Sequence, residues 1–492
     1  MKNIIALIAF VLIATACKEQ KSSQEQTYDK NTATVTGTMT VPDNVPVIDQ
    51  MMVYKFNEDL NDYDEFKGTV DKNGNFKITI DLDKPKQLTL MGNSQIYFIA
   101  VPGDSIHITF NDSGVQGEEA QNIVFSGDRV STNTALLQYS KDRPLDATRL
   151  QAIYEGGTAT DLSTYLDAQM PAMNTFMDIF LGTNKGDLYL KEYVAADRKY
   201  GLLNTKLTFN AYAGSRGLAP ADMVDLTSVE ENVPVLEVSD FINSLQTEQY
   251  LYYIASAMRT KTKDKLTENS APEEAQSAFL KTIESIKNNA LLQSKIVYRS
   301  TVNDFEANGI SFYENNKEAI KKFVITEQFA KLTERYNATK SLLENPTIPA
   351  NAELLTFKNT EAVAYIDEII ANADGKVIYI DNWATWCGPC KQEFQAASPA
   401  LHEKFKDDVE FIYLCHQSER KGYEPSIAKY KIAGKHYFLS QEESTPIFGQ
   451  IKLEGFPTYT IINKKGEIVI SDYTYRPSYP GTTDVLTALI NE

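Results

Sequence analysis

The sequence predicts a multidomain chain with an N-terminal all-β, sandwich-like domain, a central α-helical region and a C-terminal α/β domain. Three observations indicate this order. Apolar and polar residues alternate from Thr34 to about Val124, which is the period of a half-buried strand. Apolar residues then recur every three or four positions from about Ser131 to Asn345, and short strand-like and helix-like segments alternate after about Ala350. A length of 492 residues fits about three domains.

The N-terminus has the pattern of an export signal. Lys2 supplies a positive charge, and the apolar run Ile4–Ala14, at about 1.5 Å per residue, is too short for a hydrocarbon core of about 30 Å. The small residues before Cys17 resemble a bacterial lipobox, although alanine stands where the lipobox usually has leucine. This resemblance implies a lipoprotein signal peptide at 1–16, lipidation of Cys17 and a flexible tether at 17–32. The alternative is an ordinary secretory signal with an incidental cysteine.

Residues 33–130 carry the signals of a β domain. Asn73-Gly74 lies between the strand-like runs Phe66–Val70 and Phe76–Leu82, which predicts a β-hairpin. Further strands are expected at Gln87–Met91, Ile96–Val101 and Ile106–Phe110, with a turn at Pro102-Gly103-Asp104. This strand pattern and the turn resemble a β domain of unknown function that precedes thioredoxin-like domains in many Gram-negative lipoproteins.

Residues 131–346 have a helical period. The apolar residues recur at three- and four-residue steps in Tyr193, Ala196, Tyr200, Leu203 and Leu207, in Phe279, Ile283 and Ile286, and in Phe323, Phe329, Leu332 and Tyr336. A helix is expected to begin near Ser270-Ala271-Pro272. The aromatic stripes favour a buried helical core, with a ligand groove as the alternative.

The last domain, residues 350–492, alternates strands with helices around a mixed sheet. Strands are expected at Leu354–Phe357, Val377–Asp381, Val409–Cys415, Thr458–Asn463 and Glu467–Ser471. Helices are expected at Glu361–Ala371, from the cysteines towards Ala397, around Pro425–Lys431 and at Thr483–Asn491.

The run Trp386-Cys387-Gly388-Pro389-Cys390 stands where a buried strand passes into a helix. Two cysteines at this spacing indicate a thiol/disulfide redox pair. Unpaired backbone N–H groups and the positive dipole end of the helix favour a thiolate there. A free cysteine of pKa near 8.5 is only about 3 % ionised at neutral pH, whereas a pKa of about 7, as in thioredoxin, leaves about half as thiolate.

The C-terminal domain resembles the thioredoxin fold, and within it the TlpA/ResA-like group of membrane-tethered thiol:disulfide oxidoreductases. The resemblance rests on the motif Trp383–Phe394 and on Gly455-Phe456-Pro457-Thr458. It implies that Cys387, at the exposed helix start, is the nucleophile. Cys390, less exposed, then resolves the mixed disulfide. An inert disulfide staple is disfavoured because so short a loop contributes little chain entropy.

The same resemblance assigns roles to other residues. Pro457 matches the cis-proline that faces the disulfide, so that Phe456 and its carbonyl can pair with a client backbone. Trp386 is expected to form part of this docking surface, and Trp383 to lie in the core.

Two carboxylates complete the expected site. Asp381 matches the buried acid of thioredoxin; burial should raise its pKa and let it take the proton from Cys390. The alternative is a partly exposed carboxylate at a strand end. Glu393 is expected on the same helix face as Cys390 and matches an acidic residue of the TlpA/ResA-like group, with a solvated helix surface as its alternative.

Charge and composition exclude several classes of function. The chain has 48 basic and 66 acidic residues, a net charge of −18, which argues against nucleic acid as a partner. The four histidines are scattered and only Cys387 and Cys390 are closely spaced, so neither a metal site nor a cofactor is expected. Cys415, followed by His416, is expected to be a small buried residue rather than a reactive thiol.

The resemblance implies an enzyme of the cell envelope that faces the periplasm and is held by a lipid anchor, with outer-membrane association open. Its expected partners are disulfide-containing client proteins and a membrane-borne electron donor. Cytochrome c biogenesis is one process in which such an enzyme is expected to take part. Two alternatives remain: a thiol peroxidase, which the Trp-Cys-Gly-Pro-Cys context disfavours, and an envelope ligand-binding lipoprotein with an accessory redox domain.

Overall fold

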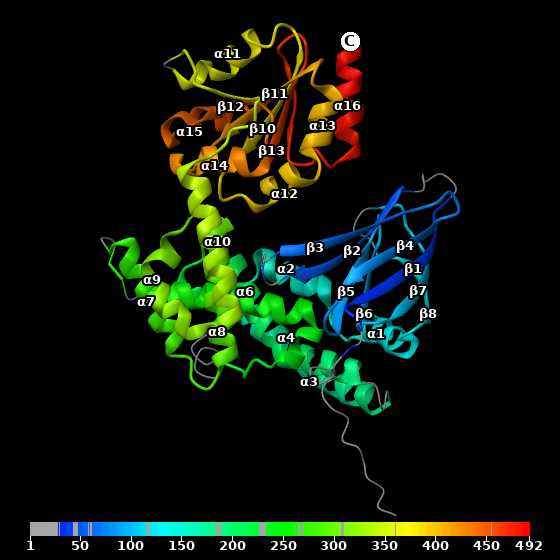
Figure 1. The fold of residues 1–492 in the computed structure, drawn as a ribbon. Helices are drawn as coiled ribbons and strands as arrows, with labels where there is room; N and C mark the ends of the chain where they lie inside the picture. Colours follow the sequence, from blue (N-terminus) through cyan, green and yellow to red (C-terminus); the bar gives the residue numbers. More distant parts are fainter. Residues whose placement is uncertain are drawn as a thin grey trace, which may run out of the picture. The chain divides into compact units, whose positions relative to one another are not determined.

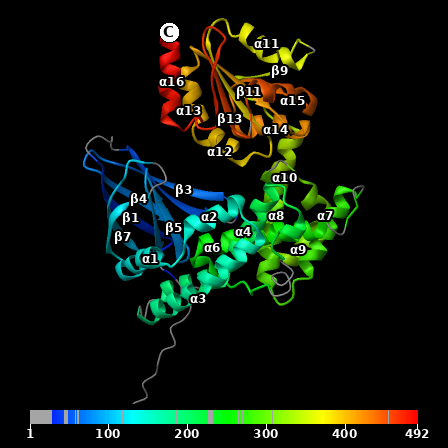
Figure 2. The same ribbon diagram turned by 180° about the vertical axis from the view of Figure 1, so that it is seen from behind.

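The computed structural model describes residues 28, 30–42, 48–57, 59, 62–115, 119–183, 188–225, 233–263, 266–267, 270–306, 309–359, 361–453 and 455–492. The expected signal peptide and the lipidation site Cys17 lie outside these residues. The chain divides into two compact units (Figures 1 and 2), the first formed by residues up to 268 with 281–293 and the second by 269–280 with 294–492.

The first unit begins with β-strands. Their bounds are β1 (Thr32–Thr40), β2 (Gln50–Asn57), β3 (Asp62–Thr69), β4 (Asn75–Asp81), β5 (Lys86–Met91), β6 (Gln95–Ala100), β7 (Ser105–Asn111) and β8 (Gln121–Gly127). They form two four-stranded sheets, ordered β4-β1-β7-β8 and β3-β2-β5-β6. Alternate residues of both sheets, such as Val35, Val53 and Phe98, share one buried core. The predicted β-rich N-terminal part is therefore present.

The predicted hairpin at Asn73-Gly74 is correct in its turn and wrong in its strand pairing. Gly74 has a φ of 79° and its N–H donates to the Asp71 carbonyl. After a single bridge between Val70 and Phe76 the strands separate, because β3 pairs with β2 and β4 pairs with β1 in the other sheet. The turn thus carries the chain from one sheet to the other.

The middle of the chain is helical, as predicted. Its helices are α1 (Val130–Asp142), α2 (Ala147–Gly156), α3 (Ala159–Thr183), α4 (Leu188–Ser215), η2 (Pro220–Asp222), η3 (Val238–Ile242), α6 (Ser244–Lys263), α7 (Pro272–Glu284), α8 (Ala290–Glu306), α9 (Ser311–Phe323) and α10 (Thr326–Glu344). The predicted stripe on α4 is buried at Tyr193, Ala196, Tyr200 and Leu207. Among the described residues, no helix combines the length and apolarity needed to cross a membrane.

Strands and helices of the first unit share a second core. Ile99 of β6 packs with Tyr139 of α1, Met177 of α3 and Val194 of α4. The buried Asn133 side chain of α1 accepts from the Ile99 N–H at 2.7 Å and donates to the Ile99 carbonyl at 3.0 Å. The two compact units therefore divide the chain at positions other than the predicted domain boundaries at 130 and 346. Those domain boundaries stay a prediction.

The C-terminal part of the second unit alternates strands and helices. The elements are β9 (Ala352–Leu355), η4 (Ala362–Ala364), α11 (Tyr365–Ala371), β10 (Val377–Trp383), α12 (Gly388–Ala396), α13 (Ser398–Phe405), β11 (Val409–Cys415), α14 (Arg420–Tyr430), β12 (Gly434–Phe438), α15 (Gln441–Gln450), β13 (Thr458–Ile462), β14 (Ile468–Asp472) and α16 (Pro480–Asn491). The strands form a six-stranded sheet ordered β14-β13-β10-β11-β12-β9, in which β10 runs parallel to β11 and antiparallel to β13.

This sheet is buried on both faces. One core joins Tyr379 and Trp383 of β10 to residues of α12, α13, α14 and α16, and Figures 1 and 2 show α13 and α16 side by side. The other core joins Ile378 and Ile380 to α11 and α15. Every residue of β10 is buried, which is why this strand reads as an apolar run rather than an alternation.

Three elements of this part, α13, β12 and α15, were not predicted as separate elements, and the first strand was shifted. The predicted strand Leu354–Phe357 ends at Leu355 in the structure. Phe357 leaves the sheet and stacks on Tyr437, with 4.2 Å between ring centroids. This aromatic contact is long-range and leaves no local signal.

The two turns of the β domain provide a test of the fold. Gly74 and Gly103 both have positive φ angles, of 79° and 96°. A Cβ at Gly74 would lie 2.0 Å from the Met39 carbonyl oxygen, whereas a Cβ at Gly103 would meet nothing within 4 Å. We therefore expect Gly103→Ala to lower the free energy of unfolding by about 1–2 kcal/mol. Gly74→Ala should cost at least about 1 kcal/mol more, because overpacking adds to the backbone cost. Urea unfolding followed by circular dichroism measures both; equal losses would contradict the turn geometry.

Candidate active site

The two cysteines lie at the N-terminus of α12 and form a disulfide bond. Cys387 is the N-cap residue, and its Sγ accepts a hydrogen bond from the backbone N–H of Cys390 at 3.2 Å. Pro389 stands in the first turn, where its missing N–H costs no helical hydrogen bond. The predicted placement of the pair at a helix start is therefore observed.

The expectation that Cys387 is exposed is wrong. Cys387 is 3 % exposed and Cys390 is 0 % exposed. Both belong to the buried cluster that contains Trp383, and Phe456 packs against this cluster. The order of exposure agrees with the prediction, but Cys387 is covered by side chains that come from distant parts of the sequence.

The loop before β13 lies beside the disulfide helix. The Phe456–Pro457 peptide bond is cis, as predicted. The rings of Phe456 and Trp386 meet edge to face with 5.7 Å between centroids. Trp386 is 55 % exposed and its Nε1–H donates to the Gln417 carbonyl at 2.8 Å, so its ring is fixed yet accessible. Trp383 is fully buried, in agreement with its predicted core role.

A hollow of about 730 Å³ joins several of the predicted residues. It is lined by Pro389 and Glu393 of α12, by Phe456 and Pro457, and by Arg476 after β14. Three of the predicted site residues, Glu393, Phe456 and Pro457, therefore line one open depression, together with Pro389 from between the two cysteines.

Glu393 is held by the chain segment that follows β14. Its carboxylate accepts from the Ser478 N–H at 2.9 Å and from the Ser478 hydroxyl at 2.7 Å, and it lies 3.8 Å from Arg476 Nε. These contacts disfavour the alternative of a purely solvated helix surface. They indicate that Glu393 fixes one wall of the hollow.

Asp381 is fully buried on β10, and the part of the chain that the structure describes offers no hydrogen-bond partner to either of its carboxylate oxygens. Its strand position places it on the same face as Tyr379 and Trp383, the face that α12 covers. Burial, with a smaller contribution from the charge of Glu393, raises the pKa of Asp381 well above its usual value. The alternative of an exposed strand-end carboxylate is therefore wrong.

A buried polar chain on the opposite face of β10 was missed by the sequence analysis. The Asn382 Nδ2 donates to the Thr458 carbonyl at 3.0 Å, directly after Pro457. Asn382 Oδ1 lies 3.1 Å from His416 Nε2, and His416 Nδ1 lies 3.1 Å from the Ser444 hydroxyl. Burial lowers the pKa of His416 to about 3, so this histidine is neutral at physiological pH. These contacts between buried polar side chains fix the loop that carries Pro457.

The thiol of Cys415, the neighbour of His416, has hydrogen-bond contacts with Ser418 and with the backbone of Thr385. Cys415 is buried and does not form a disulfide bond, and burial raises the pKa of its thiol to about 12. The prediction that Cys415 is an inert thiol is therefore supported. The ring of His416 packs on that of Phe456, with 5.7 Å between ring centroids.

A second missed feature follows Cys390 in the sequence. Lys391 is 8 % exposed, and its ammonium group donates to the carbonyl of Glu306 at the end of α8, within the same compact unit. The Glu306 carboxylate also pairs with Arg335 and with Lys429. Burial and the charge of Lys429 lower the pKa of Lys391 to about 8. A lysine on a helix gives no sequence signal for such burial.

The described residues contain no cluster of three or more histidine, cysteine or acidic side chains that could hold a metal ion. Cys17 lies outside these residues, so its lipidation stays a prediction.

Comparisons with known proteins give matches to part of the chain. No family model matches the chain. The thiol-disulfide oxidoreductase ResA of Bacillus cereus is 27% identical over 96 residues, which are 19% of this chain and 53% of the relative. The chain thus spans about half the length of the curated relative that it matches. About a fifth of the chain is similar in sequence to a protein named as a thiol-disulfide oxidoreductase.

Solved structures give matches of similar extent. A protein of Bacteroides vulgatus described as a thiol-disulfide oxidoreductase is 31% identical, with 25% of this chain and 78% of that chain covered and a TM-score of 0.23. A protein of Chlorobium tepidum described as the thiol:disulfide interchange protein DsbE is 22% identical, with 25% and 82% covered and a TM-score of 0.21.

The buried Asp381 predicts a specific pH dependence of stability. Because its folded pKa is raised, the folded state binds a proton that the unfolded state releases above about pH 4, and stability falls as pH rises through the folded pKa. Asp381→Asn removes this loss. We expect the variant to gain up to about 1.4 kcal/mol per pH unit over the unchanged protein between pH 4 and 7.

Urea unfolding at several pH values measures this difference. Asp407→Asn, at an exposed position, serves as the matched control and should follow the unchanged protein. A pH-independent difference for Asp381→Asn would show that the carboxyl group is not held in its protonated form.

Proposed function

We propose that this chain is a TlpA/ResA-like thiol:disulfide oxidoreductase whose C-terminal part has the thioredoxin-like α/β fold. The observation that carries the proposal is the Cys387–Cys390 disulfide at the N-terminus of α12, next to the loop with Pro457. The sequence similarity to ResA supports the same activity.

The reaction begins from the reduced Cys387–Cys390 pair. The Cys387 thiolate attacks one sulfur of a client disulfide; a Cys387–client bond forms as the client S–S bond breaks, and the departing sulfur takes a proton from solvent. Cys390 then gives its proton to the ionised Asp381 carboxylate and attacks the Cys387 sulfur. The Cys387–client bond breaks, and the second client sulfur leaves as a thiolate that takes a proton from solvent. The client gains two electrons and two protons, and the enzyme returns to the disulfide form seen here.

The helix terminus stabilises the charge that this reaction needs. The Cys390 N–H already donates to Cys387 Sγ, and it can stabilise negative charge on that sulfur in the reduced protein. The positive end of the α12 dipole acts in the same direction. Cys387 is thus the catalytic nucleophile and Cys390 the resolving group.

Asp381 is placed to handle the proton of Cys390. It lies on the face of β10 that α12 covers, and its raised pKa makes its ionised form a stronger base, able to take the proton when Cys390 attacks. A carboxylate of ordinary pKa would be too weak a base for a thiol of pKa near 8.5. Glu393 shapes the wall of the hollow and raises the pKa of Asp381 through its charge.

Client binding is assigned to the hollow beside the disulfide. Trp386 supplies an exposed aromatic surface, and Phe456 packs against it. Because Pro457 has no N–H, the carbonyl of Phe456 is the group that can pair with a client strand. The Asn382–His416–Ser444 chain keeps this loop in place from behind.

Reduction is the proposed direction. Gly388-Pro389 between the cysteines matches thioredoxin, whose potential is near about −270 mV, against about −120 mV for the oxidant DsbA. A reductant in the cell envelope requires a membrane-borne electron donor. The proposal includes export, a lipid anchor at Cys17 and a site that faces the periplasm.

Trapping of mixed disulfides tests the proposal directly. Cys390→Ala removes the resolving thiol, so Cys387 should remain bound to its clients. We expect client adducts that dithiothreitol reverses and that disappear in Cys387→Ala/Cys390→Ala.

Cys415→Ala is the matched control, because its buried thiol should take no part. It should reduce insulin disulfides at the rate of the unchanged protein, whereas Cys387→Ala should lose this activity by at least about 1000-fold. Adducts that persist without Cys387, or insulin reduction that survives its loss, would contradict the assignment.

A further inference from the structure

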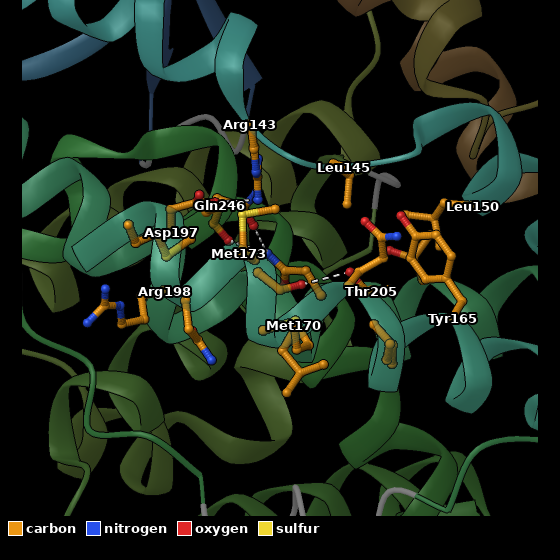
Figure 3. A pocket seen from close by; sticks show the side chains of 18 of the residues that line it. Arg143, Leu145, Leu150, Tyr165, Met170, Met173, Asp197, Arg198, Thr205 and Gln246 are labelled. Atoms are coloured by element: carbon orange, nitrogen blue, oxygen red, sulfur yellow. Dashed lines mark hydrogen bonds and ion pairs between the residues drawn. The ribbon is translucent and has the colours of Figure 1, made fainter. Parts of the chain in front are cut away.

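Two neighbouring hollows lie between helices of the first compact unit, and Figure 3 shows the smaller of them. The smaller, of about 200 Å³, is lined by residues of α2, α3, α4 and α6 and by Arg143 at the end of α1. The larger, of about 550 Å³, shares four of its lining residues: Leu166, Met170, Asn174 and Leu202. The redox chemistry of the C-terminal part uses none of them.

Asn204 of α4 presents an unused hydrogen-bond acceptor to the smaller hollow. It is 3 % exposed, and its Nδ2 donates to the backbone carbonyl of Gln246 at 2.9 Å and to Gln246 Oε1 at 2.6 Å. Its Oδ1 is buried and has no partner among the described residues. Leaving a buried acceptor unpaired destabilises the folded protein. A ligand with a donor group would remove this destabilisation.

Arg143 presents the complementary donor. Its Nη2 lies 3.1 Å from Asp197 Oδ1, and Asp197 Oδ2 accepts from the Tyr139 hydroxyl at 2.5 Å. The Arg143 Nε is buried and no described atom accepts from it. In Figure 3 the Arg143 side chain extends towards Met173 and Gln246. Because Arg143 is paired with Asp197, this part of the hollow favours an uncharged polar group over an ion.

The rest of the smaller hollow has both apolar and polar walls. Leu150 of α2 and Tyr165, Met170, Met173 and Met177 of α3 line it. Methionine side chains adapt to ligands of different shape because they are unbranched and flexible. Gly201 leaves room beside the polar end: a Cβ there would meet Asp197 Oδ1 at 3.6 Å and Arg143 Nη2 at 3.7 Å, which are ordinary contacts.

We propose that the smaller hollow is a binding site for a small uncharged amide with an apolar substituent. The amide N–H donates to Asn204 Oδ1, the amide carbonyl accepts from Arg143 Nε, and the apolar part contacts the methionines. A carboxamide is the simplest neutral group that supplies both a donor and an acceptor. The site lies in the first unit and does not depend on the redox assignment.

The test uses 4-methylpentanamide as the probe with the full mature chain. Saturation-transfer NMR and calorimetry should detect its binding. Methyl 4-methylpentanoate lacks the donor, and 4-methylpentanoate lacks the donor and carries a charge. Methyl 4-methylpentanoate should bind at least about 5-fold more weakly, which corresponds to the loss of one hydrogen bond of about 1 kcal/mol. The charged 4-methylpentanoate should bind more weakly still, because its charge adds a desolvation cost.

A pair of glycine variants locates the site. Gly201→Leu fills the polar end of the hollow and should abolish binding of the amide. Gly182→Leu, on α3 where an added Cβ meets nothing within 4 Å, is the matched control and should bind as the unchanged chain does. Circular dichroism confirms that both variants fold.

Three results would overturn the proposal. The first is no binding of the amide to the unchanged chain, which would leave the hollow as a place for water only. The second is equal binding of amide and ester. The third is binding of the amide that survives in folded Gly201→Leu.

Discussion

The N-terminal position of Cys387 on α12 is the constraint on which the proposed chemistry depends. The backbone N–H of Cys390 donates to its sulfur, and this N–H is available because the first turn of a helix lacks internal acceptors for it. The buried strand β10 ends just before this turn and fixes where the helix starts. Moving the cysteine one turn into α12 would pair that N–H within the helix and remove the stabilisation of a thiolate.

β10 serves the site from both of its faces. Asp381 lies on the face covered by α12, where burial raises the pKa of its carboxyl group. Asn382, the next residue, points to the other face and binds the Thr458 carbonyl and His416. Successive side chains of a strand point to opposite faces, so these two consecutive residues have different roles. Asp381 can bind a proton on the side of the disulfide, and Asn382 supports the loop that carries Pro457.

The structural features that were predicted correctly are those that local sequence patterns determine. The helix start at the cysteines, the strand Val409–Cys415 and the burial of Asp381 follow from short-range signals. Apart from the approach of the Pro457 loop to the disulfide, which the family resemblance implied, contacts between distant segments were not predictable. Phe456 covers the cluster that contains Cys387, and the strands flanking Asn73-Gly74 choose partners in different sheets. The burial of His416, like that of Lys391, depends on partners that come from other elements.

The rate of alkylation of reduced Cys387 as a function of pH tests the central claim most directly. The variant Cys390→Ala/Cys415→Ala keeps the backbone N–H at position 390 and leaves Cys387 as the reporting thiol of the described residues. The account predicts an apparent pKa of about 7 and labelling by iodoacetamide at pH 7 faster than that of a small free thiol. An apparent pKa of about 8.5 or above, with no faster labelling, would contradict it.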